Sequence, residues 1–212
     1  MYTVTDRVSN PFGFRPDCAQ FVPGYGDVNA AFHVIGDHPG IHGGTDTQVP
    51  FSNAPGRRLL GVLAAGGLLE TADVPPTADE TYLSYLHLCV PDGTTPSHRS
   101  YLACEPFIDA EVRAIAAHVL LPVGRRATDY VLRTHSAQAR RLRAGMSRLH
   151  ATEIAGNGFL IMPVAEPADW SGADARALTD ALVQLQATDY RREADLGRFL
   201  AEVAHTSSDD SY

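Results

Sequence analysis

Short apolar runs alternate with amphipathic stretches along most of the chain. The first run, AFHVI at 31–35, consists mostly of apolar residues that favour strands and ends at a glycine, as a buried parallel strand does. Similar runs predict further strands, and apolar residues at helical spacing predict helices between them. The predicted strands cover 31–35, 82–89, 118–123 and 159–164, and the predicted helices cover 55–69, 99–117, 126–132 and 173–190. This alternation predicts an α/β fold of three α/β/α layers, with a central four-stranded, mainly parallel sheet.

A chain of 212 residues is long enough for one substantial core. We expect a single domain over 1–205, whose first part, 1–30, is an irregular arm rich in Pro, Gly, Asn and Asp. The polar, acidic residues 206–212 predict a flexible tail. The N-terminus has neither a basic start nor an apolar run, and the apolar stretch 59–69 is far shorter than the roughly 20 residues of a membrane span. We therefore expect a cytoplasmic protein without a membrane role, and a monomer.

The formal net charge is −8, and all 17 basic residues are arginine. Such a surface suits a saline cytoplasm, where salt screens the repulsion between carboxylates, and a GC-rich genome that favours arginine codons explains it equally well. The overall charge opposes tight binding of nucleic acids at low salt, because affinity for phosphates comes largely from clustered cations. Any such contact must therefore use local arginine groups. These are Arg57 with Arg58, Arg125 with Arg126, and Arg140 and Arg141 with Arg143. For the last group, a solvated face is the more common explanation.

The chain has three cysteines, Cys18, Cys89 and Cys104, and they cannot all pair with one another. Because no secretion signal is present either, we expect no disulfide framework. Two interpretations stay open, which are buried inert thiols and metal ligands.

The segment GDHPGIHGGTDTQVPFS at 36–52 is the most informative loop, because ligands bind in open α/β sheets where the strands end. It combines glycines, which permit close approach of a ligand, with His38, His42 and two aspartates. The Gly-Lys-Ser/Thr of a phosphate-binding Walker loop is absent from it, which argues against nucleoside triphosphate chemistry. The two histidines are four residues apart, but we expect Pro39 and Gly40 to prevent a helix there, so a zinc pair is not predicted.

Five blocks in order resemble the uracil-DNA glycosylase superfamily, most closely its iron–sulfur branch, family four. The blocks are HVIGDHPG, VPFS with the following GRRLLGVLAAGGLL, YLSYLHLCVP, LACEPFIDAEVRAI and HVLLPVGRRATDYVL. The resemblance covers most of the chain. It implies a DNA-repair enzyme that rotates a damaged nucleotide out of DNA and hydrolyses the bond between the base and deoxyribose. The base would be uracil or another deaminated base, and the partner would be DNA that contains it.

The resemblance also assigns roles within the loop. Asp37 stands where the family has a glutamate, and would position water and stabilise the oxocarbenium character of the sugar; the alternative is a residue that caps the turn. His38 lies at a variable position of the pattern, and a histidine there could act as an acid, a base or an orienting group; the alternative is that His38 or His42 hydrogen-bonds the backbone of the turn. Phe51 would stack on the base. The loop backbone that lines the base would be that of Gly36, Pro39 and Gly40.

Two positions depart from the family pattern. Tyr85 stands where the family has an asparagine that hydrogen-bonds the uracil edge, and its single hydroxyl would change base specificity. Glu166 stands where the family has a histidine that supports negative charge on the departing base, and only a protonated glutamate would donate there. The structural alternatives are core packing for Tyr85 and a solvated loop carboxylate for Glu166.

The iron–sulfur branch holds a 4Fe-4S cluster with four cysteines, and the resemblance matches Cys89 and Cys104 to two of them. Of the N-terminal pair only Cys18 is left, so either a group other than cysteine completes the site or the cluster is lost. Three hypotheses follow: an active glycosylase, a catalytically reduced member that binds DNA or a base, and an iron–sulfur structural or redox protein.

Overall fold

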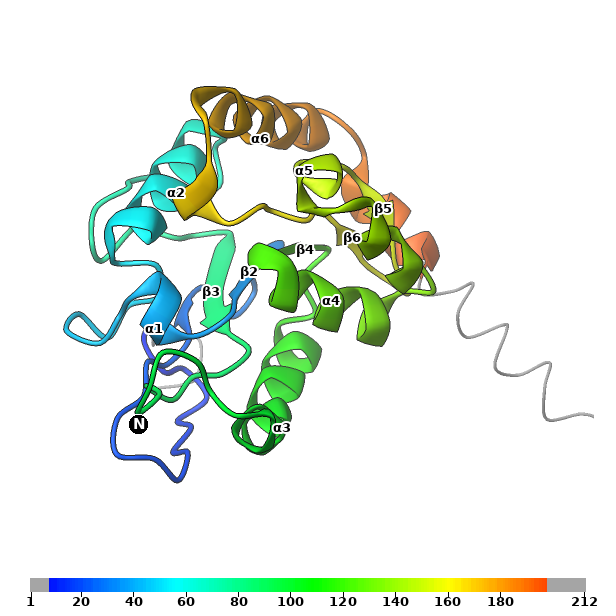
Figure 1. The fold of residues 1–212 in the computed structure, drawn as a ribbon. Coiled ribbons are helices and arrows are strands. Elements are labelled where there is room, and N and C mark those ends of the chain that lie inside the picture. Colours follow the sequence, from blue (N-terminus) through cyan, green and yellow to red (C-terminus); the bar gives the residue numbers. More distant parts are fainter. Residues whose placement is uncertain (1–7, 198–212) are drawn as a thin grey trace, which may run out of the picture.

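A computed structural model describes residues 8–197, and its centre is a six-stranded sheet (Figure 1). The strands are β1 (Tyr25–Gly26), β2 (Phe32–Gly36), β3 (Thr81–Tyr85), β4 (Val119–Pro122), β5 (Ile154–Ala155) and β6 (Leu160–Ile161). Their order in the sheet is β1-β3-β2-β4-β6-β5. The predicted parallel strands are β2, β3, β4 and β6, and antiparallel β1 and β5 are added at the two edges. The edge strands were not predicted, because two residues are too few to show a pattern; β1 lies in the arm that we expected to be irregular.

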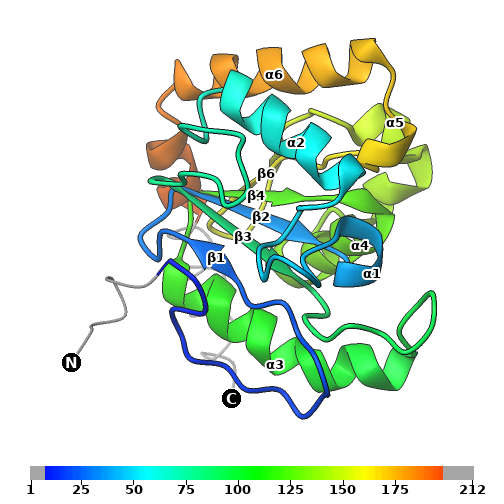
Figure 2. The ribbon, with the colours of Figure 1, turned by 90° about the vertical axis from the view of Figure 1, so that its left-hand side faces the viewer.

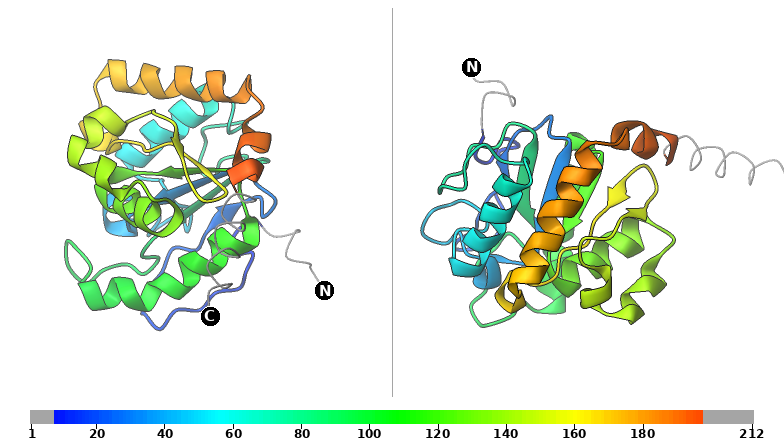
Figure 3. Two further views of the ribbon diagram at one scale, coloured as in Figure 1. Left: turned by 90° about the vertical axis from the view of Figure 1, so that its right-hand side faces the viewer. Right: turned by 90° about the horizontal axis from the view of Figure 1, so that it is seen from above.

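Helices cover both faces of this sheet, as the predicted three layers require. They are α1 (Pro39–His42), α2 (Ala54–Ala65), α3 (His98–Ile115), α4 (Gly124–His135), α5 (Met146–Leu149) and α6 (Gly172–Gln186), with 3-10 turns η2 (Ala139–Ala144) and η3 (Pro167–Asp169). Helices α2 and α6 pack together on one face, and α3 and α4 lie on the other (Figures 1 and 2). Residues 190–197 form a further helical segment after α6, which Figure 3 shows at the end of the described chain.

Strand β2 is buried on both faces, and its side chains alternate between two cores. Val34 belongs to the core under α2 and α6, which includes Leu59 and Leu182. Ile35 belongs to the core under α3 and α4, which includes Ile108 and Val131. Because β2 is central and parallel to its neighbours, the loops after β2, β3, β4 and β6 all leave the same edge of the sheet.

The arm is tied to the segment that follows β3. Phe21 forms an antiparallel bridge with Cys89, and a disulfide joins Cys18 to Cys89 with a Cα–Cα distance of 6.2 Å. The expectation that the cysteines form no disulfide is therefore wrong for this pair. The sequence separation of 71 residues hides the contact, which arises because the arm runs antiparallel to this segment.

Within residues 8–197, no helix is both long and apolar enough to cross a membrane. The flexible tail predicted at 206–212 lies outside the described residues.

Candidate functional site

The loop after β2 begins with a single helical turn, α1. His38 is its N-cap, and the Nδ1 atom of His38 accepts a hydrogen bond from the Gly40 amide at 3.1 Å. Pro39 occupies the start of the turn, where its missing N–H costs nothing. The expectation that Pro39 and Gly40 prevent a helix here is therefore wrong. The turn ends at Gly43, whose φ of 85° suits glycine.

Asp37 lies between the two helices that cover the α3/α4 face. The hydroxyl of Tyr101, on α3, donates to Asp37 Oδ1 at 2.5 Å, and Nε of Arg126, on α4, lies 3.5 Å from Oδ2. The Arg126 guanidinium also lies 4.4 Å above the centre of the Tyr101 ring. Burial and the bond to Asp37 raise the pKa of Tyr101, so this hydroxyl keeps its proton and remains a donor. Two separate helices thus hold the carboxylate in one orientation.

A second pair of ionisable groups lies on the other side of Asp37. His42 is fully buried, and its Nδ1 accepts a hydrogen bond from the Asp37 amide at 3.3 Å. This assigns the proton to Nε2, which lies 3.2 Å from both carboxylate oxygens of Glu166. The imidazole therefore connects the backbone of Asp37 to the side chain of Glu166.

The aromatic cluster consists of His42, Phe51 and Tyr85, and it fills the space under Gly36. Ring centres are 5.3 Å apart for Phe51 and Tyr85, and 5.3 Å apart for His42 and Phe51. A Cβ atom on Gly36 would lie 2.8 Å from atoms of all three side chains. Phe51 has no exposed surface, and Tyr85 is 1% exposed. The rings of Phe51 and Tyr85, which were both predicted to bind the base, thus pack against each other in the interior.

The Tyr85 hydroxyl is also fully used inside the protein. It accepts a hydrogen bond from the Phe51 amide at 2.7 Å and donates to the Gly43 carbonyl at 2.9 Å. Phe51 has a φ of 62°, an unusual backbone conformation for a residue with a side chain, and the bond from its amide helps to hold it. Burial raises the pKa of Tyr85.

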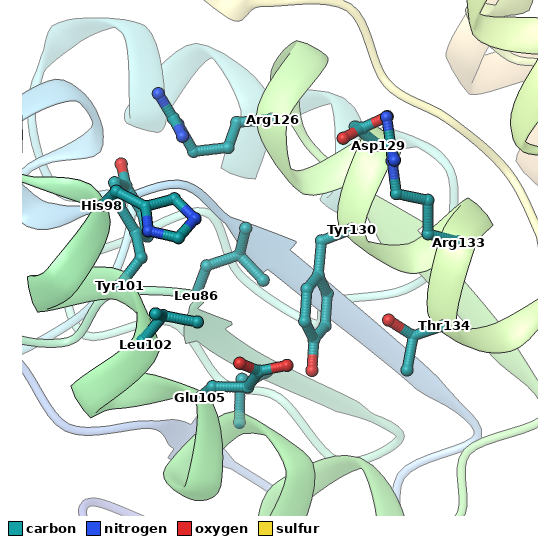
Figure 4. A pocket seen from close by; sticks show the side chains of 11 residues that line it. Leu86, His98, Tyr101, Leu102, Glu105, Arg126, Asp129, Tyr130, Arg133 and Thr134 are labelled. Carbon is teal, nitrogen blue, oxygen red and sulfur yellow. The ribbon is translucent and has the colours of Figure 1, made fainter.

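Asp37 and Glu166 border one polar cleft of about 470 Å³. The other residues that line this cleft, which we call the Asp37 cleft, are Gly124, Arg125, Arg126, Asp129, Arg133 and Leu142. Figure 4 shows a second cavity, of about 350 Å³, on the α3 side of α4, with Tyr130 and Leu86 in its wall. Both hollows are bordered by the same three side chains of α4, which are Arg126, Asp129 and Arg133. Helix α4 therefore forms part of the wall of each hollow.

Two further histidines lie close to Asp37. The buried Nε2 atom of His38 has no hydrogen-bond partner within the described residues, and burial lowers the pKa of this imidazole. The ring of His87 packs against that of Tyr101 at 5.2 Å, and the His87 amide donates to the Asp37 carbonyl at 3.0 Å. Burial lowers the pKa of His87 as well. Both histidines are therefore biased towards their neutral forms beside the carboxylate.

The fold brings most of the predicted site residues together. Asp37, His38, Pro39 and Gly40 form the loop, Gly36, Phe51 and Tyr85 lie beneath it, and Glu166 reaches it from the segment after β6. Sequence reasoning missed Tyr101 and Arg126 as partners of Asp37. Their signals were weak, because Tyr101 precedes the LACEPF block and Arg126 was noted only in an arginine doublet.

The cysteines form a separate group beside the arm. Cys104 is buried next to the Cys18–Cys89 disulfide, in a cluster with Leu88 and Phe107. Burial raises the pKa of the Cys104 thiol. In the part of the chain that the structure describes, no three His, Cys, Asp or Glu side chains are placed to hold a metal ion. With two of three cysteines in a disulfide, the residues present do not fit a cluster held by four thiolates.

The chain matches one family model and several curated relatives. The model of the uracil DNA glycosylase superfamily matches residues 23–186, which include the Asp37 loop and Glu166. A type-4 uracil-DNA glycosylase of Saccharolobus solfataricus is 24% identical over 148 residues, which cover 69% of this chain and 65% of the relative. A type-5 uracil-DNA glycosylase of Mycobacterium leprae is 26% identical over 138 residues, covering 61% and 60%. Another of Thermus thermophilus is 30% identical over 127 residues, covering 57% and 58%. The chain thus spans less than two thirds of the length of these relatives.

Proposed function

Because the chain belongs to the uracil DNA glycosylase superfamily, we propose that it hydrolyses the N-glycosidic bond of a deaminated base in DNA. The observation that carries this proposal is the Asp37 carboxylate, which borders an open polar cleft and is held by Tyr101 and Arg126. The relatives named as uracil-DNA glycosylases support the same reaction class. The proposed substrates are uracil and other deaminated bases in DNA.

In the proposed reaction, Asp37 orients a water molecule and stabilises positive charge on the sugar as the bond to the base breaks. Water adds its oxygen to the sugar carbon, the base leaves with the bonding electrons, and the proton of the water is released. Aspartate is one methylene shorter than the family's glutamate. The contacts from Tyr101 and Arg126 support a catalytic role despite this, because they limit the carboxylate to one orientation.

The leaving base needs support for its negative charge. An ionised Glu166 would repel that charge, and its carboxylate oxygens lie 3.2 Å from His42 Nε2. In the proposed step, Glu166 takes up a proton from solvent, gives it to the leaving base and returns to its carboxylate form, while the hydrogen bond from His42 Nε2 orients its carboxyl group. His38, whose Nε2 has no described partner, is a second candidate donor.

The aromatic cluster favours one competing function, in which a member of the superfamily binds DNA without cleaving a base from it. Phe51 and Tyr85 have almost no exposed surface, so neither ring offers a free face to a base in this conformation. Base binding there requires that the base displaces His42 or Tyr85. Both residues remain predicted base-binding positions.

An alkaline cleavage assay separates the two functions. Oligonucleotides that contain uracil, hypoxanthine or xanthine are incubated with the pure protein in low and in molar salt, and abasic sites are then cleaved with alkali. We expect scission that falls by about a hundredfold or more in Asp37→Asn. The matched control is Asp46→Asn, an exposed aspartate of the same loop, which keeps the activity. Binding without scission under every condition would favour the non-cleaving member, and full activity of Asp37→Asn would remove Asp37 from the mechanism.

A further inference from the structure

Positive charge is concentrated in one short part of this acidic chain. Residues 124–145 contain six arginines and one aspartate, whereas the whole chain has a net charge of −8. This segment comprises α4, η2 and the turn between them, which pack against each other. Every arginine in it is exposed. The surface of α4 and η2 is therefore strongly cationic on an otherwise acidic protein.

These arginines line two neighbouring hollows, the first of which is the Asp37 cleft. A second hollow, of about 260 Å³, shares Arg125, Asp129, Arg133 and Leu142 with that cleft. Beyond the shared residues, the wall of this second hollow is formed by Ala139, Arg140 and Arg143. One end of this surface is thus Asp37 with Glu166, and the other end is the pair of arginines on η2. We call the surface of these two neighbouring hollows together the arginine groove.

Several of its cations have no acidic partner in the described structure. Arg126 pairs with Asp37, and Arg133 pairs with Asp129 at 2.8 Å. None of the ion pairs within residues 8–197 involves Arg125, Arg140 or Arg143.

The arginine pair Arg57 and Arg58 has structural contacts instead. Arg57 donates to the Ser52 carbonyl at 2.8 Å, and Arg58 donates to the carbonyls of Pro167 and Ser171 at 3.3 Å. Exposed cations that lie side by side without counter-charges repel one another, and a bound polyanion removes that repulsion.

We propose that the arginine groove binds the phosphodiester backbone of a DNA strand and leads that strand past Asp37. Guanidinium groups suit this ligand because they bind phosphate oxygens in a bidentate manner. Contacts of this kind position the strand without selecting its sequence. The inference deepens the proposed function and rests on it, since the strand must pass the carboxylate for the base to be cleaved.

Salt-dependent binding tests the groove separately from the chemistry. Fluorescence anisotropy measures the Kd for a labelled single-stranded oligonucleotide at several salt concentrations, with Asp37→Asn in every protein to prevent cleavage. The test variant adds Arg140→Gln and Arg143→Gln. The matched control adds Arg176→Gln, on α6, and Arg192→Gln, in the helical segment after it; both arginines are exposed, and neither lines the arginine groove. Both variants lose the same net charge, and thermal melting checks that both are folded.

We expect the groove variant to raise Kd about tenfold at low salt and to reduce the slope of log K against log salt by about 1.4, since each lost contact to a single strand removes roughly 0.7. The control should change both quantities far less. Equal weakening in the two variants, or no weakening in either, would overturn the groove. So would competition by inorganic phosphate at matched ionic strength that fully displaces the strand, because it indicates a site for one small anion.

The cleavage assay keeps this inference apart from the proposed function. In the background with an intact Asp37, the groove variant should need more protein to reach half of the maximal single-turnover rate, while the maximal rate stays the same. If the groove variant binds the strand as tightly as before and cleavage is observed, the result supports the proposed function and contradicts the role of the arginine groove. If the groove variant binds the strand more weakly but no protein cleaves it, the result supports the role of the arginine groove and contradicts the proposed function.

Discussion

The Asp37 cleft and the aromatic cluster lie on two sides of the same short loop, and they differ in polarity and in how their side chains are held. On the cleft side, Asp37 borders an open polar cleft, and its partners are a hydroxyl and a guanidinium. On the cluster side, Phe51 and Tyr85 are buried, and the polar atoms of that region are bonded within the protein. One side of the loop carries charged and polar side chains at a cleft, and the other side is part of the packed core.

This difference separates two requirements of base excision, the chemistry and the recognition of the base. The carboxylate that the proposed chemistry needs borders the cleft and is oriented, with 9% of the residue's surface exposed. The two positions that the family resemblance assigns to base recognition have become part of the packed interior. Mutations on the cleft side should therefore alter rates, and mutations on the cluster side should alter stability.

Phe51→Ala should have the largest effect on stability. Removing a fully buried aromatic side chain leaves a cavity, and we expect the free energy of unfolding to fall by about 3–5 kcal/mol. Urea denaturation measures it. Val183→Ala on α6, where the valine is 53% exposed, is the control and should change stability by less than about 0.5 kcal/mol. A loss for Phe51→Ala as small as that of the control would mean that the ring is free to receive a base.

The same change of tyrosine to phenylalanine on each side gives the sharpest contrast. Tyr85→Phe leaves the Phe51 amide and the Gly43 carbonyl without their buried partner, and we expect a loss of about 2–3 kcal/mol in stability. Tyr101→Phe removes one contact from Asp37, and we expect a smaller loss of stability and about a tenfold lower cleavage rate. Urea denaturation and single-turnover cleavage are measured for both proteins. If Tyr85→Phe proves the slower enzyme and Tyr101→Phe the less stable protein, the division between the two sides fails.

A smaller effect, which depends on pH, is expected from a second carboxyl group, the buried Glu111, on the stability of the fold. Glu111, on α3 like Tyr101, accepts a hydrogen bond from the Tyr82 hydroxyl at 3.0 Å, and burial raises its pKa from 4.5 to about 8. The folded protein therefore binds this proton over a pH range in which the unfolded chain has lost it. The stabilisation that comes from this bound proton is therefore lost as the pH rises from about 4.5 through about 8.

Glu111→Gln tests this linkage, because glutamine does not titrate. Relative to the variant, the unchanged protein should lose about 2 kcal/mol of unfolding free energy between pH 6 and pH 8. Urea denaturation at the two pH values gives the difference, and contributions from histidines common to both proteins cancel. A difference between the proteins that does not vary with pH would show that Glu111 has no raised pKa.

Much of the fold could be predicted because it depends on local patterns. The apolar run 31–35 became β2, and the helix predicted at 55–69 is α2, which ends where Gly66 and Gly67 begin. The pattern failed for α1, where proline is tolerated at the first position of a helical turn. It also failed for the cysteine pair, because the bridge depends on how the arm lies against the segment after β3.

The sequence by itself determined the α/β alternation and the place of Asp37 at the edge of the sheet, because strand periodicity and glycines act over a few residues. Only the tertiary structure decided which groups meet there. Tyr101 and Arg126 reach Asp37 from two helices, and His42 meets Glu166 across a separation of 124 residues. Such contacts depend on how helices cross the sheet and how side-chain volumes fill the core, which no local pattern encodes. For the same reason, the burial of Phe51 and Tyr85 in one cluster was not visible in their spacing along the chain.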